Sequence, residues 1–167
     1  NPDSFDECPV LKIIAILEAA IDGGGGFGQA FNALLQLQRI CQNRFEFEVL
    51  TTQGANLPVL RKLGIDAEQV RVTWRDRFVS RVALHPLWHS WQSRVEWLGP
   101  LEKKVIRRGG DLVYFLGPSA NSGMMQKTNV IVTLYDLCHR DHPEFPEVRA
   151  KGQFFSRERF LRSNMLA

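Results

Sequence analysis

Apolar positions along this chain follow two periods, one typical of buried β-strands and one typical of amphipathic α-helices. Strand-like runs occupy residues 10–17, 45–51, 69–74, 112–116 and 130–135. Helical patterns occupy residues 27–42, 58–64, most of 75–108, and 154–167. Because helical stretches separate the strands, the pattern predicts crossover connections and a parallel sheet.

The polarity of the strand-like runs also predicts their order in the sheet. The first, fourth and fifth runs are almost continuously apolar, as expected for strands covered on both faces. In the second run Phe45 and Phe47 share one face of the strand and Glu46 lies on the other. The third run alternates in the same way, so both belong toward an edge. We therefore predict a Rossmann-like, doubly wound α/β domain with strand order 3-2-1-4-5 and helices on both faces. A ligand would bind at the carboxyl ends of the first and fourth strands, where the order reverses.

The composition is that of one globular domain spanning residues 1–167. Hydrophobic residues make up 44% of the chain and charged residues 23%, which excludes a disordered protein. The net charge of +3 is too small to predict a nucleic-acid partner. No apolar run approaches the roughly 20 residues that span a bilayer. Three widely spaced cysteines fit reduced thiols, so we expect a cytoplasmic location.

Positive charge is concentrated in residues 74–108. This segment holds eight Lys and Arg against three Asp and Glu, a net charge of +5, together with Trp88, Trp91 and Trp97. Two interpretations remain open. The segment is either a solvated helix whose tryptophans belong to the core, or a face that lies against an anionic membrane surface. Under the second interpretation the protein is peripheral at the inner face of the membrane.

A glycine-rich segment, residues 23–28 (GGGGFG), separates the first strand from the first helix. Missing Cβ atoms let backbone N–H groups approach a phosphate, and a helix N-terminus adds a favourable dipole. Gly23, Gly25 and Gly28 satisfy the spacing of the dinucleotide fingerprint, which leaves a nicotinamide-dependent oxidoreductase as an alternative. However, residues 18–22 intervene after the strand, and the second strand ends without an acidic residue for a ribose. Besides a phosphate site and a nicotinamide site, a third interpretation is a glycine turn that binds no ligand.

Polar loops follow the fourth and fifth strands. Ser119 and Asn121 supply hydroxyl and amide groups suited to sugar or phosphate oxygens. The denser cluster after the fifth strand consists of Tyr135, Asp136, Cys138, His139, Asp141 and His142. A metal site, a polar ligand site and a capped turn are all compatible with this cluster. Since no second group of ligands lies downstream, we expect no metal and no bound cofactor.

The chain resembles family 4 glycosyltransferases. The resemblance rests on the glycine segment after the first strand and on the fifth strand, VIVTLYDL, which continues into CHRDHPEF and matches the family's "DLxH…PEF" segment. It covers essentially all 167 residues. It implies the acceptor-side domain of a two-domain, B-type, metal-independent retaining transferase of polysaccharide or glycolipid synthesis. The implied partners are a nucleotide-sugar donor, a glycan or lipid-linked acceptor, and a second domain outside these residues.

The resemblance also assigns roles to individual residues. Gly24, Gly25 and Gly26 would lie against the donor diphosphate, and His139 and Asp136 match the histidine and aspartate of the family segment. Ser119, Asn121 and Tyr135 are the expected contacts of the acceptor or of the transferred sugar. Tyr135 stands where many relatives have histidine.

Two expectations follow for the chain as a whole. The isolated chain should be inactive, because the acidic motif that grips the donor belongs to the second domain. A noncatalytic domain that docks a partner through its basic, Trp-rich segment remains an alternative of a different class.

Overall fold

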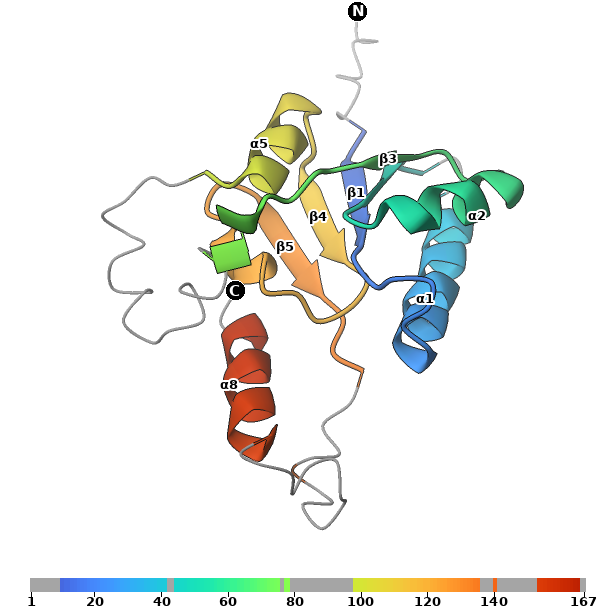
Figure 1. Ribbon diagram of the computed structural model, residues 1–167. Helices are drawn as coiled ribbons and strands as arrows, with labels where there is room; N and C mark the ends of the chain where they lie inside the picture. The colour runs from blue at the N-terminus through green and yellow to red at the C-terminus, as the bar shows by residue number, and fades with distance from the viewer. Residues whose placement is uncertain are drawn as a thin grey trace, which may run out of the picture.

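The computed structural model describes residues 10–41, 44–75, 77–78, 98–135, 140 and 153–165. Its sheet has five parallel strands, which are β1 (Lys12–Leu17), β2 (Glu46–Thr51), β3 (Ala67–Gln69), β4 (Leu112–Phe115) and β5 (Asn129–Val132). The order is β3-β2-β1-β4-β5 (Figure 1), which confirms the predicted topology and the α/β class.

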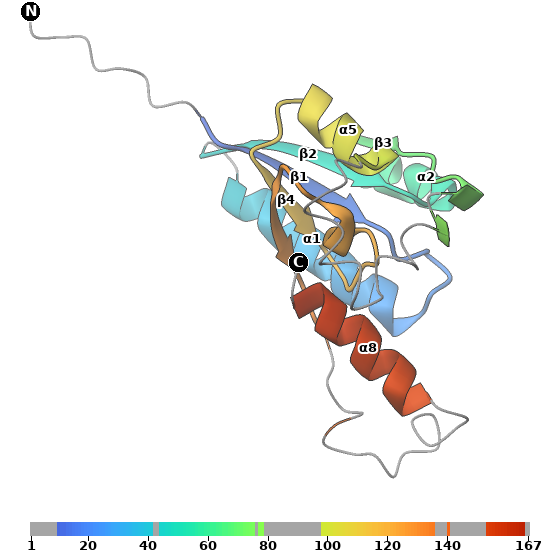
Figure 2. The ribbon, with the colours of Figure 1, turned by 90° about the vertical axis from the view of Figure 1, so that its left-hand side faces the viewer.

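Helices lie between the strands and beyond the last one. They are α1 (Gly25–Cys41), α2 (Leu57–Lys62), α5 (Pro100–Arg107) and α8 (Gln153–Met165), with 3-10 turns η1 (Gly54–Asn56) and η2 (Ser122–Met124). Figure 2 shows α1 and α5 on opposite faces of the sheet. In the described parts of the chain, no helix has the length and apolar character needed to cross a membrane.

Each face of the sheet carries its own hydrophobic core. Ile14 and Ile16 of β1 pack in a cluster with Leu101 and Val105 of α5. Ala15 and Leu17 point to the other face, where they pack in a cluster with α1 and α2 residues. Residues 13–17 are all buried, because alternate side chains of one strand supply both cores. The central position predicted for the first strand is therefore confirmed.

The third strand lies earlier in the chain than its polarity pattern predicts. The predicted strand was 69–74, whereas β3 is Ala67–Gln69 and pairs with the last three residues of β2. Because β2 ends at Thr51, the chain beyond Val70 has no ladder to join. The Val70 N–H still donates to the Thr51 carbonyl (2.8 Å), but Trp74 is exposed and starts a helical turn. The alternation of Val70, Val72 and Trp74 is thus not a strand pattern.

The fifth strand is shorter and more exposed than predicted. The predicted run was 130–135, whereas β5 ends at Val132, opposite Phe115 at the end of β4. We expected a strand covered on both faces, yet Ile131 is 48% exposed and the strand alternates between exposed and half-buried positions. In the sheet that the structure describes, β5 is an edge strand, and the apolar run therefore predicted its burial wrongly.

The predicted helices are present where the chain is described, with shifted ends. The first begins at Gly25 instead of Phe27, and the last covers Gln153–Met165 instead of 154–167. Of the long helical stretch predicted over 75–108, the structure describes α5, preceded by Gly99. Residues 76 and 79–97, which include Trp88, Trp91 and Trp97, lie outside the described residues.

An ion-pair cluster ties α5 to the sheet. Glu48 of β2 accepts hydrogen bonds from Lys12 (2.8 Å) and from Arg108 (2.5 Å), and Arg108 also pairs with Glu68 of β3. Glu68 in turn pairs with Lys104. Partial burial raises the pKa of the Glu48 carboxyl, but the bonds from Lys12 and Arg108 outweigh it, so the net effect lowers this pKa.

This cluster predicts how stability changes with pH. Because the pKa of Glu48 is lower in the folded chain than in the unfolded chain, its contribution is complete above the unfolded value of about 4.3 and is lost as the pH falls through the folded value. We expect Glu48→Gln to lower the urea midpoint of unfolding at pH 7. At pH 3 the difference in urea midpoint between wild type and the variant should be smaller. A gap that is as large at pH 3 as at pH 7 would contradict this interpretation.

Candidate functional site

The candidate site lies where the carboxyl ends of β1 and β4 meet. These strands are neighbours in the sheet. The helix that follows β1 packs on one face, and the helix that precedes β4 packs on the other. Parallel sheets bind ligands at such a reversal of order, outside the carboxyl ends of their strands. The sequence-predicted glycines and the loop that holds Ser119 and Asn121 both belong to this edge.

The glycine segment forms a turn and then the first turn of α1. The Gly23 N–H donates to the Ala20 carbonyl (2.8 Å), and Gly24 has a left-handed φ of 66°. Gly25 and Gly26 are the first residues of α1. A Cβ placed at Gly24, Gly25 or Gly26 would meet no atom within 4 Å other than those of the adjacent residues and of the backbone of its own helix. The first turn of α1 therefore faces open space, and its early N–H groups have no helical partner of their own.

The loop between β1 and the glycines is fastened by β2 and η1. Asn56, which is buried, accepts a hydrogen bond from the Ile21 N–H (3.1 Å) and donates to the Ala19 carbonyl (2.8 Å). The Thr51 hydroxyl donates to the Leu17 carbonyl (2.7 Å) and accepts from the Asn56 amide (3.1 Å). These bonds fix the path of the chain from the end of β1 toward α1.

The Asn56 contacts predict a large effect on stability. Asn56→Ala removes three hydrogen bonds and leaves the partly buried Ala19 carbonyl without this partner, so we expect a loss of about 2–3 kcal/mol in the free energy of unfolding. Urea denaturation of the chain measures this loss, and Gln36→Ala, at an exposed position of α1, is the control. Equal urea midpoints for Asn56→Ala and the control would contradict the proposed role of Asn56.

Glu18 joins the loops on the two sides of the reversal. It follows β1 directly, and its carboxylate accepts a hydrogen bond from the Asn121 side-chain amide (2.6 Å). Burial raises the pKa of the Glu18 carboxyl, whereas hydrogen bonds from Ser119 and Asn121 act in the opposite direction. The net shift is upward, so Glu18 takes up a proton more readily than a solvated glutamate.

Ser119 and Asn121 lie in one tight loop after β4. The Asn121 N–H donates to the Ser119 hydroxyl (2.9 Å), and the Ser122 hydroxyl donates to the Ser119 carbonyl (2.8 Å). Ser119 and Ser122 are buried, whereas Asn121 is half-buried. The structure thus brings Ser119 and Asn121 together with Glu18.

Tyr135 lies beyond the end of β5 and packs against the β4 loop. A Cβ at Gly117 would come within 2.9 Å of the Tyr135 hydroxyl, so any larger residue there would displace the Tyr135 side chain. The hydroxyl is buried and has no hydrogen-bond partner among the described residues. Burial, and then the charge of Tyr114, raise the pKa of Tyr135 to about 12. The phenol is therefore neutral at physiological pH and can donate a hydrogen bond, but it cannot act as a base.

Helix α8 lies past the carboxyl ends of the strands (Figures 1 and 2). It contacts η2, which belongs to the β4 loop, and its Leu161 is buried. Glu158 of α8 accepts two hydrogen bonds from Arg140 (2.8 and 2.6 Å). The last helix therefore covers part of the edge to which the candidate site belongs.

The two predicted catalytic residues, Asp136 and His139, lie outside the described residues, as do Cys138, Asp141 and His142. Their roles, and a cleft shared by His139 and the glycines, stay predictions. Within the described ranges, no three His, Cys, Asp or Glu side chains lie close enough together to hold a metal ion.

Sequence reasoning missed Glu18, Thr51 and Asn56. In the sequence, Glu18 stands among the residues that separate the strand from the glycines, and Thr51 and Asn56 carry no acid that would mark the end of β2 as a ribose site. One feature pointed to Glu18, because an acidic residue directly after a fully apolar strand needs a polar partner.

Together the sheet, its order and its flanking helices define a Rossmann-like parallel α/β domain. No family model matches this chain, and neither does any curated protein sequence. Among solved structures, it is similar to formyltetrahydrofolate deformylase from Burkholderia mallei ATCC 23344, with 9% sequence identity and a TM-score of 0.36. That match covers 67% of this chain and 34% of the deformylase, so the chain spans about a third of that protein's length.

Proposed function

We propose that this chain is the acceptor-side domain of a retaining glycosyltransferase that uses a nucleotide-sugar donor. One observation carries the proposal: the open, glycine-rich start of α1 lies at the carboxyl edge where the strand order reverses. The sequence after β5, with its resemblance to family 4 glycosyltransferases, supports the same class.

The start of α1 suits the diphosphate of such a donor. The N–H groups of the first turn can donate to phosphate oxygens, and the helix dipole favours negative charge at this end. During transfer the leaving diphosphate gains charge, and donors that are already fixed in position stabilise it without reorganising. Asn56 and Thr51 supply that fixed position, because they hold the loop before the glycines.

The remaining residues fit roles around the sugar and the acceptor. Tyr135 offers a neutral hydroxyl with no described partner, and the Asn121 amide lies in the neighbouring loop. Asp136 and His139 orient the reacting sugar in this proposal. A second domain, outside these residues, supplies most donor contacts.

Ligand titration tests the proposal. We expect UDP-, GDP- or ADP-linked sugars to bind the chain no tighter than millimolar in calorimetric titrations, and we expect no change in NADH fluorescence when the chain is added. Tight binding of the nicotinamide cofactor without binding of any nucleotide-sugar would favour the oxidoreductase alternative. A parent protein that lacks a second Rossmann-like domain would favour the noncatalytic docking domain.

A further inference from the structure

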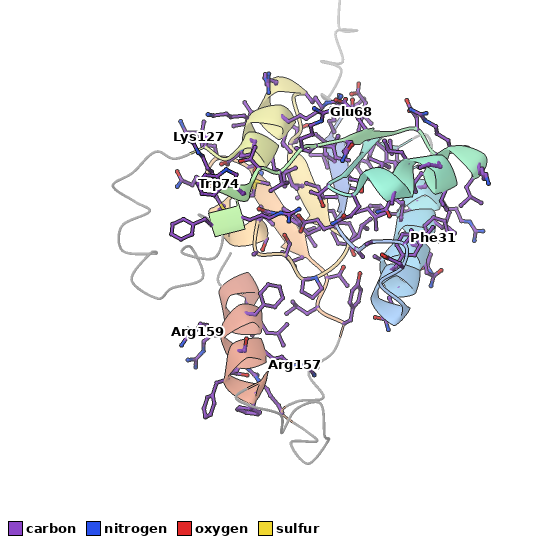
Figure 3. The ribbon with its side chains drawn as sticks, in the orientation of Figure 1. Phe31, Glu68, Trp74, Lys127, Arg157 and Arg159 are labelled. Atoms are coloured by element: carbon purple, nitrogen blue, oxygen red, sulfur yellow. The ribbon has the colours of Figure 1, made fainter. Side chains whose placement is uncertain are left out.

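We propose that a short turn after β3 is a contact site for anionic phospholipid membranes. The turn consists of Trp74, Arg75, Arg77 and Phe78, and we call it the Trp74 turn. It stands at the outside of the molecule in Figure 2, and Figure 3 labels Trp74 on it. This contact site does not depend on the proposed sugar transfer.

The two aromatic side chains of the Trp74 turn are far more exposed than their size predicts. Trp74 is 73% exposed and Phe78 is 64% exposed. The turn is helical, because the Arg77 N–H donates to the Thr73 carbonyl (3.1 Å). Residues four apart on a helix share a face, so Trp74 and Phe78 present one apolar surface to the outside. Exposed apolar surface of this kind marks interaction sites.

The same segment also carries exposed arginines. Arg71, Arg75 and Arg77 are exposed, and the Arg75 guanidinium lies 5.5 Å from the centre of the Trp74 ring. Residues 71–78 contain one acid, Asp76, so the segment has a net charge of +2. Tryptophan prefers the level of the lipid headgroups, and arginine binds the phosphates there. The charge of the turn is therefore complementary to an anionic bilayer.

The size of the Trp74 turn favours a lipid surface over a protein partner. A stable protein interface buries about 800 Å² on each side, which takes about 20–30 residues. In contrast, lipid binding grows with each aromatic side chain and each cation that reaches the interface, so a few residues suffice. The positive charge and tryptophans of residues 74–108 extend the same chemistry along the sequence.

A small pocket connects the segment before the Trp74 turn to the candidate site. Val72, two residues before Trp74, lines a small apolar pocket together with Asn121, Met124 and Met125. Asn121 belongs to the loop that bonds Glu18 at the carboxyl edge. The Trp74 turn therefore follows directly on a chain segment that shares a pocket with the loop of the candidate site.

Vesicle sedimentation of the full chain tests the proposal. The probes are vesicles of phosphatidylcholine alone and of phosphatidylcholine mixed with phosphatidylserine. We expect binding to the mixed vesicles and little binding to the neutral ones. Trp74→Ala with Phe78→Ala should lower the partition coefficient about tenfold or more. Arg75→Gln should lower it about fivefold, and added salt should weaken wild-type binding.

Matched controls come from α8, which carries an exposed phenylalanine and an exposed arginine. Phe155→Ala and Arg159→Gln should bind vesicles as wild type does, and circular dichroism should show that every variant is folded. No binding to mixed vesicles, equal binding to both vesicle types, or an unchanged Trp74→Ala/Phe78→Ala variant would overturn the proposal. Self-association in light scattering that this double variant abolishes, without vesicle binding, would assign the turn to a second copy of the chain instead.

Discussion

Gly26→Val should weaken nucleotide-sugar binding about thirtyfold in a protein that joins this chain to its second domain. Gly26 lies in the first turn of α1, and outside the neighbouring residues and the helix's own backbone no atom lies within 4 Å of the position that a Cβ would take. A valine therefore fits the fold but fills the space in front of the free N–H groups. Losing hydrogen bonds to a charged phosphate costs about 2 kcal/mol, which is about thirtyfold in Kd.

The control for this variant is Gln36→Val, at an exposed position of the same helix. It introduces the same β-branched side chain far from the carboxyl edge, so it reproduces any general effect on α1. We expect both variants to unfold at nearly the same temperature, and only Gly26→Val to lose donor affinity. Unchanged donor affinity in Gly26→Val would remove the phosphate role of the glycines.

The second large effect concerns the isolated chain, which should fold but should not transfer sugar. The two hydrophobic cores and the five-stranded sheet provide for folding. Transfer requires donor and acceptor to be held together in a reactive geometry, and the proposal assigns most donor contacts to another domain. The first turn of α1 offers a few hydrogen bonds of about 1 kcal/mol each, whereas millimolar binding takes about 4 kcal/mol. We therefore expect binding no tighter than millimolar.

Calorimetry and a turnover assay on the purified chain measure these two expectations. Millimolar or weaker binding together with no product would agree with the proposal. Micromolar donor binding would show that the chain itself contains the donor site. Product formed without any added protein would show that the chain contains the catalytic machinery.

The topology was predictable from the sequence because the burial of β1 and β2 determines their patterns of apolar and polar residues. In β1, residues 13–17 are apolar and buried without interruption, and the alternation in 45–49 indicates a strand with one wetter face. These patterns are local, so one sequence suffices to read them. They also place the glycines after the first strand, and hence at the edge where ligands bind.

Strand ends and polar contacts were less predictable, because they depend on partners distant in the chain. β3 ends opposite the last residue of β2, and the 69–74 pattern contains no information about where β2 ends. The Glu18 carboxylate accepts a hydrogen bond from Asn121, which lies 103 positions later in the chain. Asn56 accepts one from the Ile21 N–H, which lies 35 positions earlier. Polarity shows that such side chains need a partner, but only the fold shows which partner they meet.

The central claim is that the start of α1 binds the diphosphate of a nucleotide-sugar. The most direct measurement follows the backbone amide signals of the ¹⁵N-labelled chain by NMR while nucleotide-sugar is added. Gly24, Gly64 and Gly109 all have a left-handed φ, but Gly64 and Gly109 precede β3 and β4 and so lie away from the carboxyl edge. We predict saturable shifts at Gly24, Gly25 and Gly26 and none at Gly64 and Gly109. Shifts that are absent from Gly24–Gly26, or equally large at Gly64 and Gly109, would contradict the claim.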